Sequence, residues 1–214
     1  MSLRKKIAII FLINSGVFAL APAFAGDDET GFDLEALKNG EILLQTIHDD
    51  KPGGAARVTA LFHGSAEAVW DVLGYCNFEF IYIRGLKTCE VLEPGQRRMV
   101  VHHRIRNNWY TPTLDFTFEA SRRNGNIGEA RLLSGNLKAL HGLWRMVPLE
   151  NEKYLIVVHE IRIQPVIPAP RWLVRRSLRN DLPDMIACVR GLAGASASDQ
   201  KISDDLKRCP GEVK

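Results

Sequence analysis

The stretch SAEAVWDVLGYCNFEFIYIRGLKTCEVL, residues 65–92, predicts a short amphipathic helix, an aromatic connector and a returning strand. Ser65 can cap the helix through its hydroxyl, and Glu67 lies at the positive end of the helix dipole. The apolar residues that follow recur at i, i+3, i+4 and i+7, which predicts one buried helix face. They are Ala66, Val69, Trp70 and Leu73.

Strand-like segments flank this stretch on both sides and are separated by turn signals. Pro52-Gly53-Gly54 favours a turn between the first two segments, and Pro94-Gly95, Asn124-Gly125 and other Asn- or Gly-containing turn signals separate the later ones. The spacing predicts a meandering antiparallel sheet. The predicted strands are 41–47, 56–62, 88–92, 98–106, 113–120, 129–133, 137–147 and 154–163.

The alternation of residue types predicts which strand faces are apolar. His103 shares a face with Val101 and Ile105, while Phe116 and Phe118 alternate with polar residues on the next strand. An antiparallel sheet with one apolar side needs a cover on that side. The apolar side of this sheet should therefore lie against another element.

A long C-terminal helix is the best cover for the sheet. Prolines at 165, 168 and 170 end the last strand and favour a helix start. We predict a helix from about Pro170 to Leu192, interrupted at Pro183. Its buried stripe should consist of Leu178, Leu182, Met185 and Val189.

The N-terminus has the pattern of a secretory signal peptide. Basic residues at 4–6 precede an apolar run at 7–20 and an A-x-A cleavage site at 23–25. A membrane anchor is the alternative, but the run is barely long enough to span a bilayer and ends in small residues. We therefore expect a cleaved signal peptide at 1–25 and a periplasmic or secreted protein.

The net charge and the domain organisation of the mature chain follow from the predicted cleavage. The whole chain has 28 basic and 25 acidic residues, and cleavage removes three basic residues and no acid, which leaves a nearly neutral protein. This balance argues against nucleic-acid binding by global positive charge. We expect a flexible N-terminus at 26–40, one domain at 41–194 and a polar tail at 195–214.

All four cysteines follow the predicted cleavage site, and an even number in an oxidising compartment predicts two disulfides. Three pairings are open, and short sequence separation favours Cys76 with Cys89 and Cys188 with Cys209. A metal site is the rival interpretation, but the C-x-x-C and H-x-x-x-H spacings typical of zinc sites are absent from the sequence. We expect no metal and no cofactor.

The order of these elements over about 41–192 resembles the START-like helix-grip superfamily, which includes lipid-transfer domains, polyketide cyclases and coenzyme-Q-binding proteins. SAEAVWDVL at 65–73 resembles the family's first helix, and GLKTCEVL at 85–92 resembles the strand that follows. GLWRMVPL at 142–149 and PRWLVR at 170–175 resemble exported members. The resemblance implies an α+β fold, with two short helices after the first hairpin and a curved antiparallel sheet gripping the C-terminal helix around a cavity.

The implied cavity suggests candidate ligand-binding residues. His103 and His159 lie on apolar strand faces, and aromatic groups would line the pocket or its mouth at 78–82. Core packing is the alternative for each of them. Glu160 lies on the opposite strand face from its neighbour His159, so the two cannot form a dyad in one cavity. The candidates are Tyr82, His103, Trp109, Phe116, Phe118, Trp144, His159 and Trp172.

The predicted C-terminal helix has one basic edge, because Arg171, Arg175 and Arg179 recur at four-residue steps. A solvated helix face is the ordinary explanation. Beside a lipid cavity, however, such a row could engage anionic head groups of a membrane in a transient contact. The row is too short to indicate nucleic-acid binding.

These features favour a periplasmic binding or carrier protein for a lipid, isoprenoid or quinone. Ser-His-Asp order, a G-x-S-x-G elbow and a phosphate-binding glycine loop are absent from the sequence, so catalysis is not the leading hypothesis. A cyclase or dehydratase-like enzyme could use His103, Asp115 or Tyr82 as acid or base. A noncatalytic envelope interaction module is the third hypothesis. A Cys76–Cys89 bridge would restrict the connector as a lid.

Overall fold

The computed structural model describes residues 32–48, 50–107, 109, 112–149, 153–166, 170–194 and 200–211. Leu34–Lys214 forms one compact unit. The predicted signal peptide at 1–25 lies outside the described residues. Within the described part of the chain, no helix is long and apolar enough to cross a membrane.

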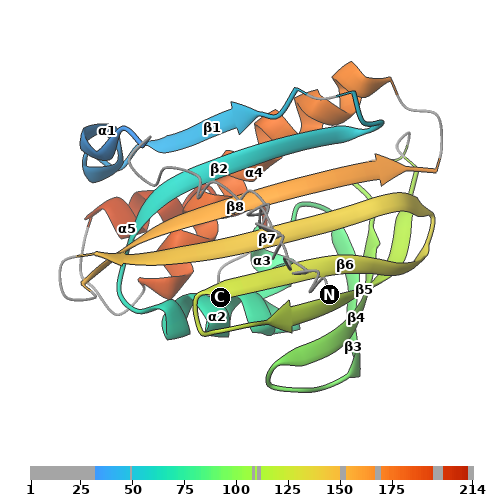
Figure 1. Cartoon of the computed structure of the whole chain (residues 1–214), viewed down its shortest axis with the longest axis horizontal. Coiled ribbons are helices and arrows are strands. Elements are labelled where there is room, and N and C mark those ends of the chain that lie inside the picture. The colour runs from blue at the N-terminus through green and yellow to red at the C-terminus, as the bar shows by residue number, and fades with distance from the viewer. Residues whose placement is uncertain are drawn as a thin grey trace, which may run out of the picture. The chain divides into compact units, whose positions relative to one another are not determined.

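Eight strands form one antiparallel sheet in the order β1-β2-β8-β7-β6-β5-β4-β3 (Figure 1), as the turn spacing predicts. The order is a meander from β3 to β8, with the first hairpin added beside β8, so β1 and β3 are the sheet edges. The strands are β1 (Ile42–Thr46), β2 (Gly54–His63), β3 (Leu86–Glu93), β4 (Arg98–Ile105), β5 (Leu114–Arg122), β6 (Ile127–Gly135), β7 (Leu137–Leu149) and β8 (Tyr154–Pro165).

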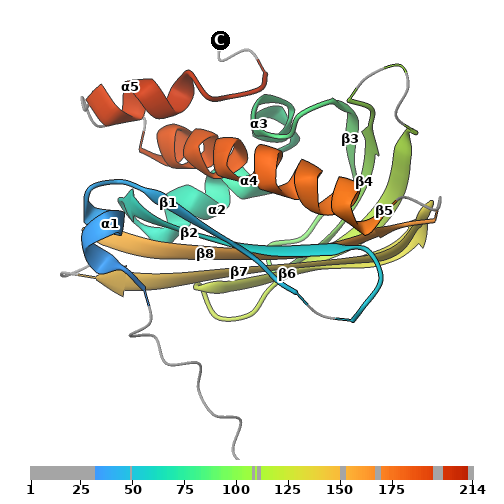
Figure 2. The same ribbon diagram turned by 90° about the horizontal axis from the view of Figure 1, so that it is seen from above.

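Two short helices follow β2, and one long helix follows β8. α2 (Ala66–Gly74) begins as predicted, because the hydroxyl of Ser65 accepts a hydrogen bond from the backbone N–H of Ala68. α3 (Cys76–Tyr82) occupies the aromatic connector. α4 (Arg171–Ala193) contains Pro183 and lies across the concave face of the sheet, while the β3–β5 side of the sheet curls toward it (Figure 2). This is the helix-grip arrangement.

The compact unit extends beyond the predicted boundaries at 41 and 194. Leu37, on α1 (Leu34–Lys38), is fully buried, and α5 (Gln200–Leu206) packs on α4. Arg190 explains how both segments are held, because its buried guanidinium pairs with Asp205 at 2.6 Å and donates to the backbone oxygen of Gly40. The segment before β1 and the segment after α4 therefore meet on the last turns of α4.

The strand register determines which residues line the concave face. His159 on β8 lies between Val58 on β2 and Trp144 on β7, and His103 on β4 lies opposite Phe116 on β5. Because side chains alternate across a strand, every second residue from these positions shares the same face. The sequence alternation placed both histidines on this face correctly.

Candidate ligand-binding site

The apolar residues of the concave face form two buried clusters. One cluster joins β2, β7 and β8 to α2, α3 and α4, and the other joins β4 and β5 to the start of β7. β7 contributes residues to both clusters, and β6 lies between β7 and β5. The exposure of the side chains along these strands differs between the two ends of the sheet.

The closed end is the end at which β2 passes into α2. Its inward-facing side chains are almost completely buried, because α2 and the second half of α4 pack directly on them. Val69 on α2 is 1% exposed. The sheet residues of the closed end are Phe62, Met146, Leu155 and Val157, all 2% exposed or less.

The open end is the opposite end, at which β8 stops and α4 begins. Several of its inward-facing apolar side chains are only partly buried, although the register points them toward the same interior as the buried Ala56, Phe116 and Leu137. Water can therefore reach apolar surface on the concave face here, and an apolar ligand would gain by covering it. The residues of the open end are Leu114, Leu132, Leu140, Ile161 and Ile163.

His159 lies at the boundary between the two ends. Its ring stacks on Trp144 with 3.9 Å between ring centroids, and its Nδ1 lies 3.2 Å from the backbone oxygen of Leu143. Burial lowers the pKa of His159 to about 4, because the charged ring would lose its hydration. The ring is therefore neutral near pH 7.

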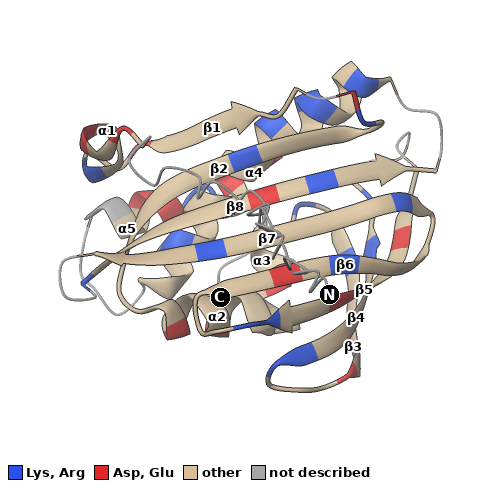
Figure 3. Cartoon of the chain, in the orientation of Figure 1, with Lys and Arg blue, Asp and Glu red and all other residues tan. Residues whose placement is uncertain are grey.

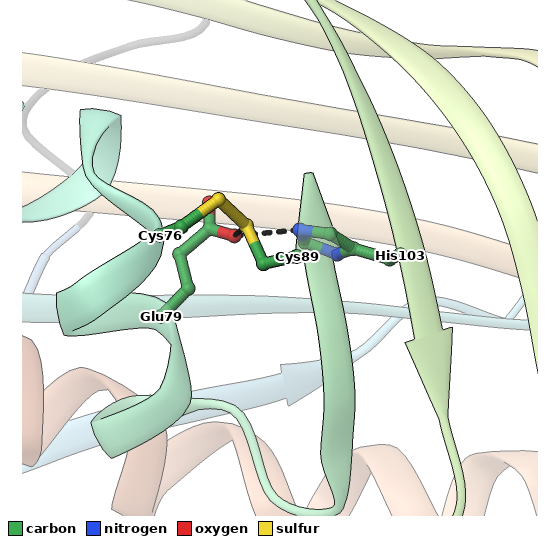
Figure 4. Close-up of a disulfide and its surroundings, with 4 residues drawn as sticks. All are labelled: Cys76, Glu79, Cys89 and His103. Carbon is green, nitrogen blue, oxygen red and sulfur yellow. Dashed lines mark hydrogen bonds and ion pairs between the residues drawn. A yellow bond between two sulfur atoms is a disulfide. The ribbon is translucent and has the colours of Figure 1, made fainter. Parts of the chain in front are cut away.

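Glu79 and His103 form a buried pair beneath α3. Oε2 of Glu79 lies 2.6 Å from Nε2 of His103, and the side chains are 10% and 4% exposed. The Cys76–Cys89 disulfide lies beside them (Figure 4), with Sγ of Cys89 2.9 Å from the same carboxylate oxygen. The rings of Phe116 and Phe118 meet the His103 ring edge to face.

Tyr82 completes this buried group. Burial raises the pKa of its phenol well above the ordinary value, and the charge of Glu79 and a hydrogen bond to it act in the same direction. A sulfur-containing metal site would need free thiolates, and both sulfurs are joined in the disulfide. The group therefore offers a carboxylate, an imidazole and a phenol in an apolar environment.

Several links hold α3 against its neighbours. Besides the disulfide to β3 and the Glu79–His103 pair to β4, Arg84 just after α3 pairs with Asp181 and Asp184 on α4. The Cys188–Cys209 disulfide returns the C-terminal segment, and Gly211 donates a backbone hydrogen bond to Ile81. Both disulfides have the pairing that short sequence separation favours. α3 is thus fixed over the β3 side of the concave face.

The structure distributes the eight candidate ligand residues among different environments. The register places His103, Phe116, Phe118, Trp144 and His159 on the concave face. The other three candidates, Tyr82, Trp109 and Trp172, lie outside this strand face.

Tyr82 is not at a pocket mouth, because it is 4% exposed and packed beside Glu79. Trp172 is 63% exposed, because it lies two residues, more than half a helical turn, before the buried Val174 of α4. Trp109 is 84% exposed in the loop after β4. The two tryptophans therefore belong to the outer surface.

A separate small cavity lies outside the concave face. It is bounded by α1, the end of β2 and the packed ends of α4 and α5, with Leu61, His63 and Arg190 in its wall. Its volume of about 40 Å³ has room for water but not for a lipid. The open end of the concave face is the better ligand site.

Comparison with known proteins agrees with this arrangement. Residues 64–190 match the family model described as polyketide cyclase / dehydrase and lipid transport. The chain belongs to this family. A search of the curated proteins found no match.

The fold of this family member is also found in solved structures. A fragment of a STAR-related lipid transfer protein from Xanthomonas axonopodis, residues 25–204, has a TM-score of 0.62 and 13% identity, with 71% of this chain and 93% of that fragment covered. Human StAR-related lipid transfer protein 5 has a TM-score of 0.59 and 12% identity, covering 74% and 84%. The Zhui aromatase/cyclase from Streptomyces sp. R1128 has a TM-score of 0.52 and 17% identity, covering 73% and 98%. At these identities the likeness establishes the fold.

Glu79 is the site residue that sequence reasoning missed. The sequence feature that could have indicated Glu79 is its position within the aromatic run NFEFIY, residues 77–82. An acid surrounded by apolar residues is a candidate for a buried carboxylate. A buried carboxylate needs a hydrogen-bonding partner, and His103 on an apolar strand face was available. The pair joins segments 24 residues apart, so only the fold brings it together.

Proposed function

We propose that this chain is a periplasmic carrier that binds an apolar small molecule, such as a lipid, isoprenoid or quinone, on the concave face beneath α4. The observation that carries the proposal is the partial exposure of inward-facing apolar residues at the open end. Each 100 Å² of this surface that a ligand covers contributes about 2.5 kcal/mol. A ligand can therefore bind mainly by apolar contact, in keeping with the family.

Identification of a copurified ligand tests the proposal. We expect native mass spectrometry of protein purified from its envelope to show an apolar adduct, and delipidated protein to take up the extracted compound. Leu140→Trp should abolish this uptake by filling the open end, whereas Leu133→Trp, on the exposed outer side of β6, should not. Protein that carries and takes up no apolar compound would contradict the carrier function.

Export is tested separately from binding. We expect the protein from the periplasmic fraction to begin at Gly26 and to contain no free thiol under denaturing conditions. Full-length protein retained in the cytoplasm, or four free thiols in exported protein, would contradict this part of the proposal.

The open end also has the surface features of a membrane contact. Trp109, Val166, Trp172 and Leu173 are exposed there, and arginines gather on the first turns of α4 (Figure 3). Arg175 differs from the predicted row, because it is partly buried and its Nε has no hydrogen-bond partner. The exposed arginines, none of which forms an ion pair with a described residue, are Arg171, Arg176 and Arg179.

We propose that this surface contacts an anionic bilayer while the ligand enters or leaves. Exposed tryptophans favour the bilayer interface, and each nearby arginine contributes about 1 kcal/mol toward an anionic surface. The double variant Arg176→Glu/Arg179→Glu should lose cosedimentation with phosphatidylglycerol-containing vesicles. The control Arg97→Glu/Lys153→Glu, with the same charge change in turns at the closed end, should retain it. Equal loss in both variants would contradict a localised contact.

A second candidate function, acid–base catalysis of the cyclase or dehydratase kind, is favoured by the buried Glu79–His103 pair. Proton transfer needs titratable groups that converge in a dry site, and Glu79, His103 and Tyr82 meet this condition. If the protein is such an enzyme, mass spectrometry should detect loss of water from its bound ligand during incubation. His103→Gln should stop this reaction while ligand uptake continues. A ligand that stays unchanged in the wild-type protein would exclude this function.

A further inference from the structure

His159 is the hydrogen-bonding side chain that the register places in the middle of the concave face. It is 4% exposed, and the inward-facing residues beside it on β2 and β8 are Val58, Val157 and Ile161. Trp144, beside it on β7, offers only a donor, the indole N–H. A ligand on this face would meet His159 as its nearest acceptor among these residues.

The contact with Leu143 determines which ring nitrogen of His159 holds the proton. A backbone carbonyl oxygen can only accept a hydrogen bond, so Nδ1 must be protonated to interact with the oxygen of Leu143 at 3.2 Å. Because burial also lowers the pKa of the ring to about 4, only one nitrogen is protonated near pH 7. Nε2 is then an unprotonated acceptor.

The surroundings leave this acceptor available. Within the part of the chain that the structure describes, the ring of His159 makes one hydrogen bond, from Nδ1 to Leu143, and one stacking contact, with Trp144. Neither contact uses the lone pair of Nε2. Nε2 lies at the end of the ring away from the backbone, on the inward side of β8. Nε2 of His159 is not among the fully enclosed, unpartnered side-chain atoms of the described residues, so part of its surface stays accessible. A ligand that donates a hydrogen bond to Nε2 would therefore gain the net contribution of that bond.

We propose that His159 selects ligands that donate a hydrogen bond, so that the carried molecule is an apolar alcohol or quinol and not the corresponding ketone, quinone or hydrocarbon. The inference rests on the proposed carrier function and names its ligand class. A carbonyl or ether oxygen placed at Nε2 would oppose one lone pair to another, whereas a hydroxyl would donate its proton to the ring nitrogen.

A matched pair of probes tests the selection. Farnesol and its methyl ether have the same apolar chain, and only the alcohol has a donor. We expect calorimetric titration at pH 7 to show that the wild-type protein binds farnesol about fivefold more tightly, the usual effect of one neutral hydrogen bond. His159→Asn can place an amide N–H near the Nδ1 position and removes Nε2, while its own amide oxygen stays closer to the backbone, so this ratio should fall to about one.

Two further measurements separate the role of the Nε2 acceptor from general effects on apolar contact or folding. Trp144→Phe should weaken both probes while leaving their ratio unchanged, because it alters apolar contact but not the acceptor. Nitrogen NMR of the wild-type protein should show His159 protonated at Nδ1, which does not depend on any variant folding.

Three results would overturn the inference: an equal affinity of the wild-type protein for both probes, an unchanged ratio in folded His159→Asn, or a proton on Nε2. If the wild-type protein binds neither probe and carries no lipid, the carrier function itself fails. The two failures are therefore distinguishable.

Discussion

The two ends of the concave face have similar amino acids but different packing. At the closed end, α2 and the later turns of α4 cover Phe62, Leu155 and Val157 completely. At the open end, residues such as Leu140 and Ile163 point to the same interior and stay partly exposed. Under the proposed function, one strand therefore contributes to stability at one end and to ligand binding at the other. The difference follows from what lies above the sheet, and not from the hydrophobicity of the strands.

The largest expected effect compares one leucine from each end. Leu155→Ala should lower the free energy of unfolding by about 4 kcal/mol, because it leaves a cavity in a fully packed region. Leu140→Ala should lower it by only about 1 kcal/mol, because its side chain is partly exposed, and should weaken ligand binding instead. Urea denaturation measures the free energy of unfolding of each variant, and ligand titration measures its affinity. Equal losses of stability would remove the distinction between the ends.

The next effect concerns the fixed position of α3. Cys76→Ala/Cys89→Ala should lower the free energy of unfolding by about 3 kcal/mol, because the disulfide closes a short loop in the unfolded chain. If α3 also limits access to the concave face, the same variant should release ligand faster in stopped-flow exchange. Removal of Cys188 and Cys209 is the matched control. Faster release in the first variant alone would show that α3 closes the β3 side.

A third effect depends on pH and on His159, at the boundary of the two ends. The pKa is about 4 in the folded protein and 6.5 ordinarily, so above pH 6.5 both states are neutral and the stability is complete. As the pH falls from 6.5 toward 4, only the unfolded state gains the proton, and stability is lost by about 2 kcal/mol at pH 5. Urea denaturation should show a smaller loss in His159→Asn. The same slope in both proteins would place the titration elsewhere.

The smallest effect compares two inward-facing glycines on adjacent strands. A Cβ at Gly128 would lie 2.8 Å from Cζ3 of Trp70 and even closer to Cη2, whereas a Cβ at Gly142 would lie 3.4 Å from Cβ of Ala130. Gly128→Ala should therefore cost about 1.5 kcal/mol through overpacking, and Gly142→Ala should change stability by less than about 0.5 kcal/mol. Thermal denaturation checks both. A destabilising Gly142→Ala would show that the interior is tightly packed there too.

Local sequence patterns predicted most of the fold. Each predicted strand corresponds to one of β1 to β8, because alternation and turn residues are local signals. The strand faces of His103 and His159 were predicted correctly for the same reason. The apolar side of the sheet predicted that the long helix covers it, and the resemblance added that the curved sheet grips this helix.

Contacts between distant segments were harder to predict. The Glu79–His103 pair and the exposure of Trp172 depend on how α3 and α4 are rotated against the sheet. Leu37 and Ile202 lie in short polar segments, each with one leucine a helical turn away, Leu34 and Leu206. So short a pattern could not predict their burial beside Arg190. The difference between the open and closed ends likewise depends on tertiary packing.

The two disulfides join separate, non-overlapping stretches of the chain, 76–89 and 188–209. If the chain is oxidised while it emerges from a membrane pore, Cys76 and Cys89 emerge before Cys188 and Cys209. Each cysteine's native partner is then its neighbour in the order of emergence. An oxidase that joins consecutive cysteines would therefore produce the native pairing directly. If the protein is exported as proposed, it should mature without a disulfide isomerase, and loss of such an enzyme should not reduce its yield.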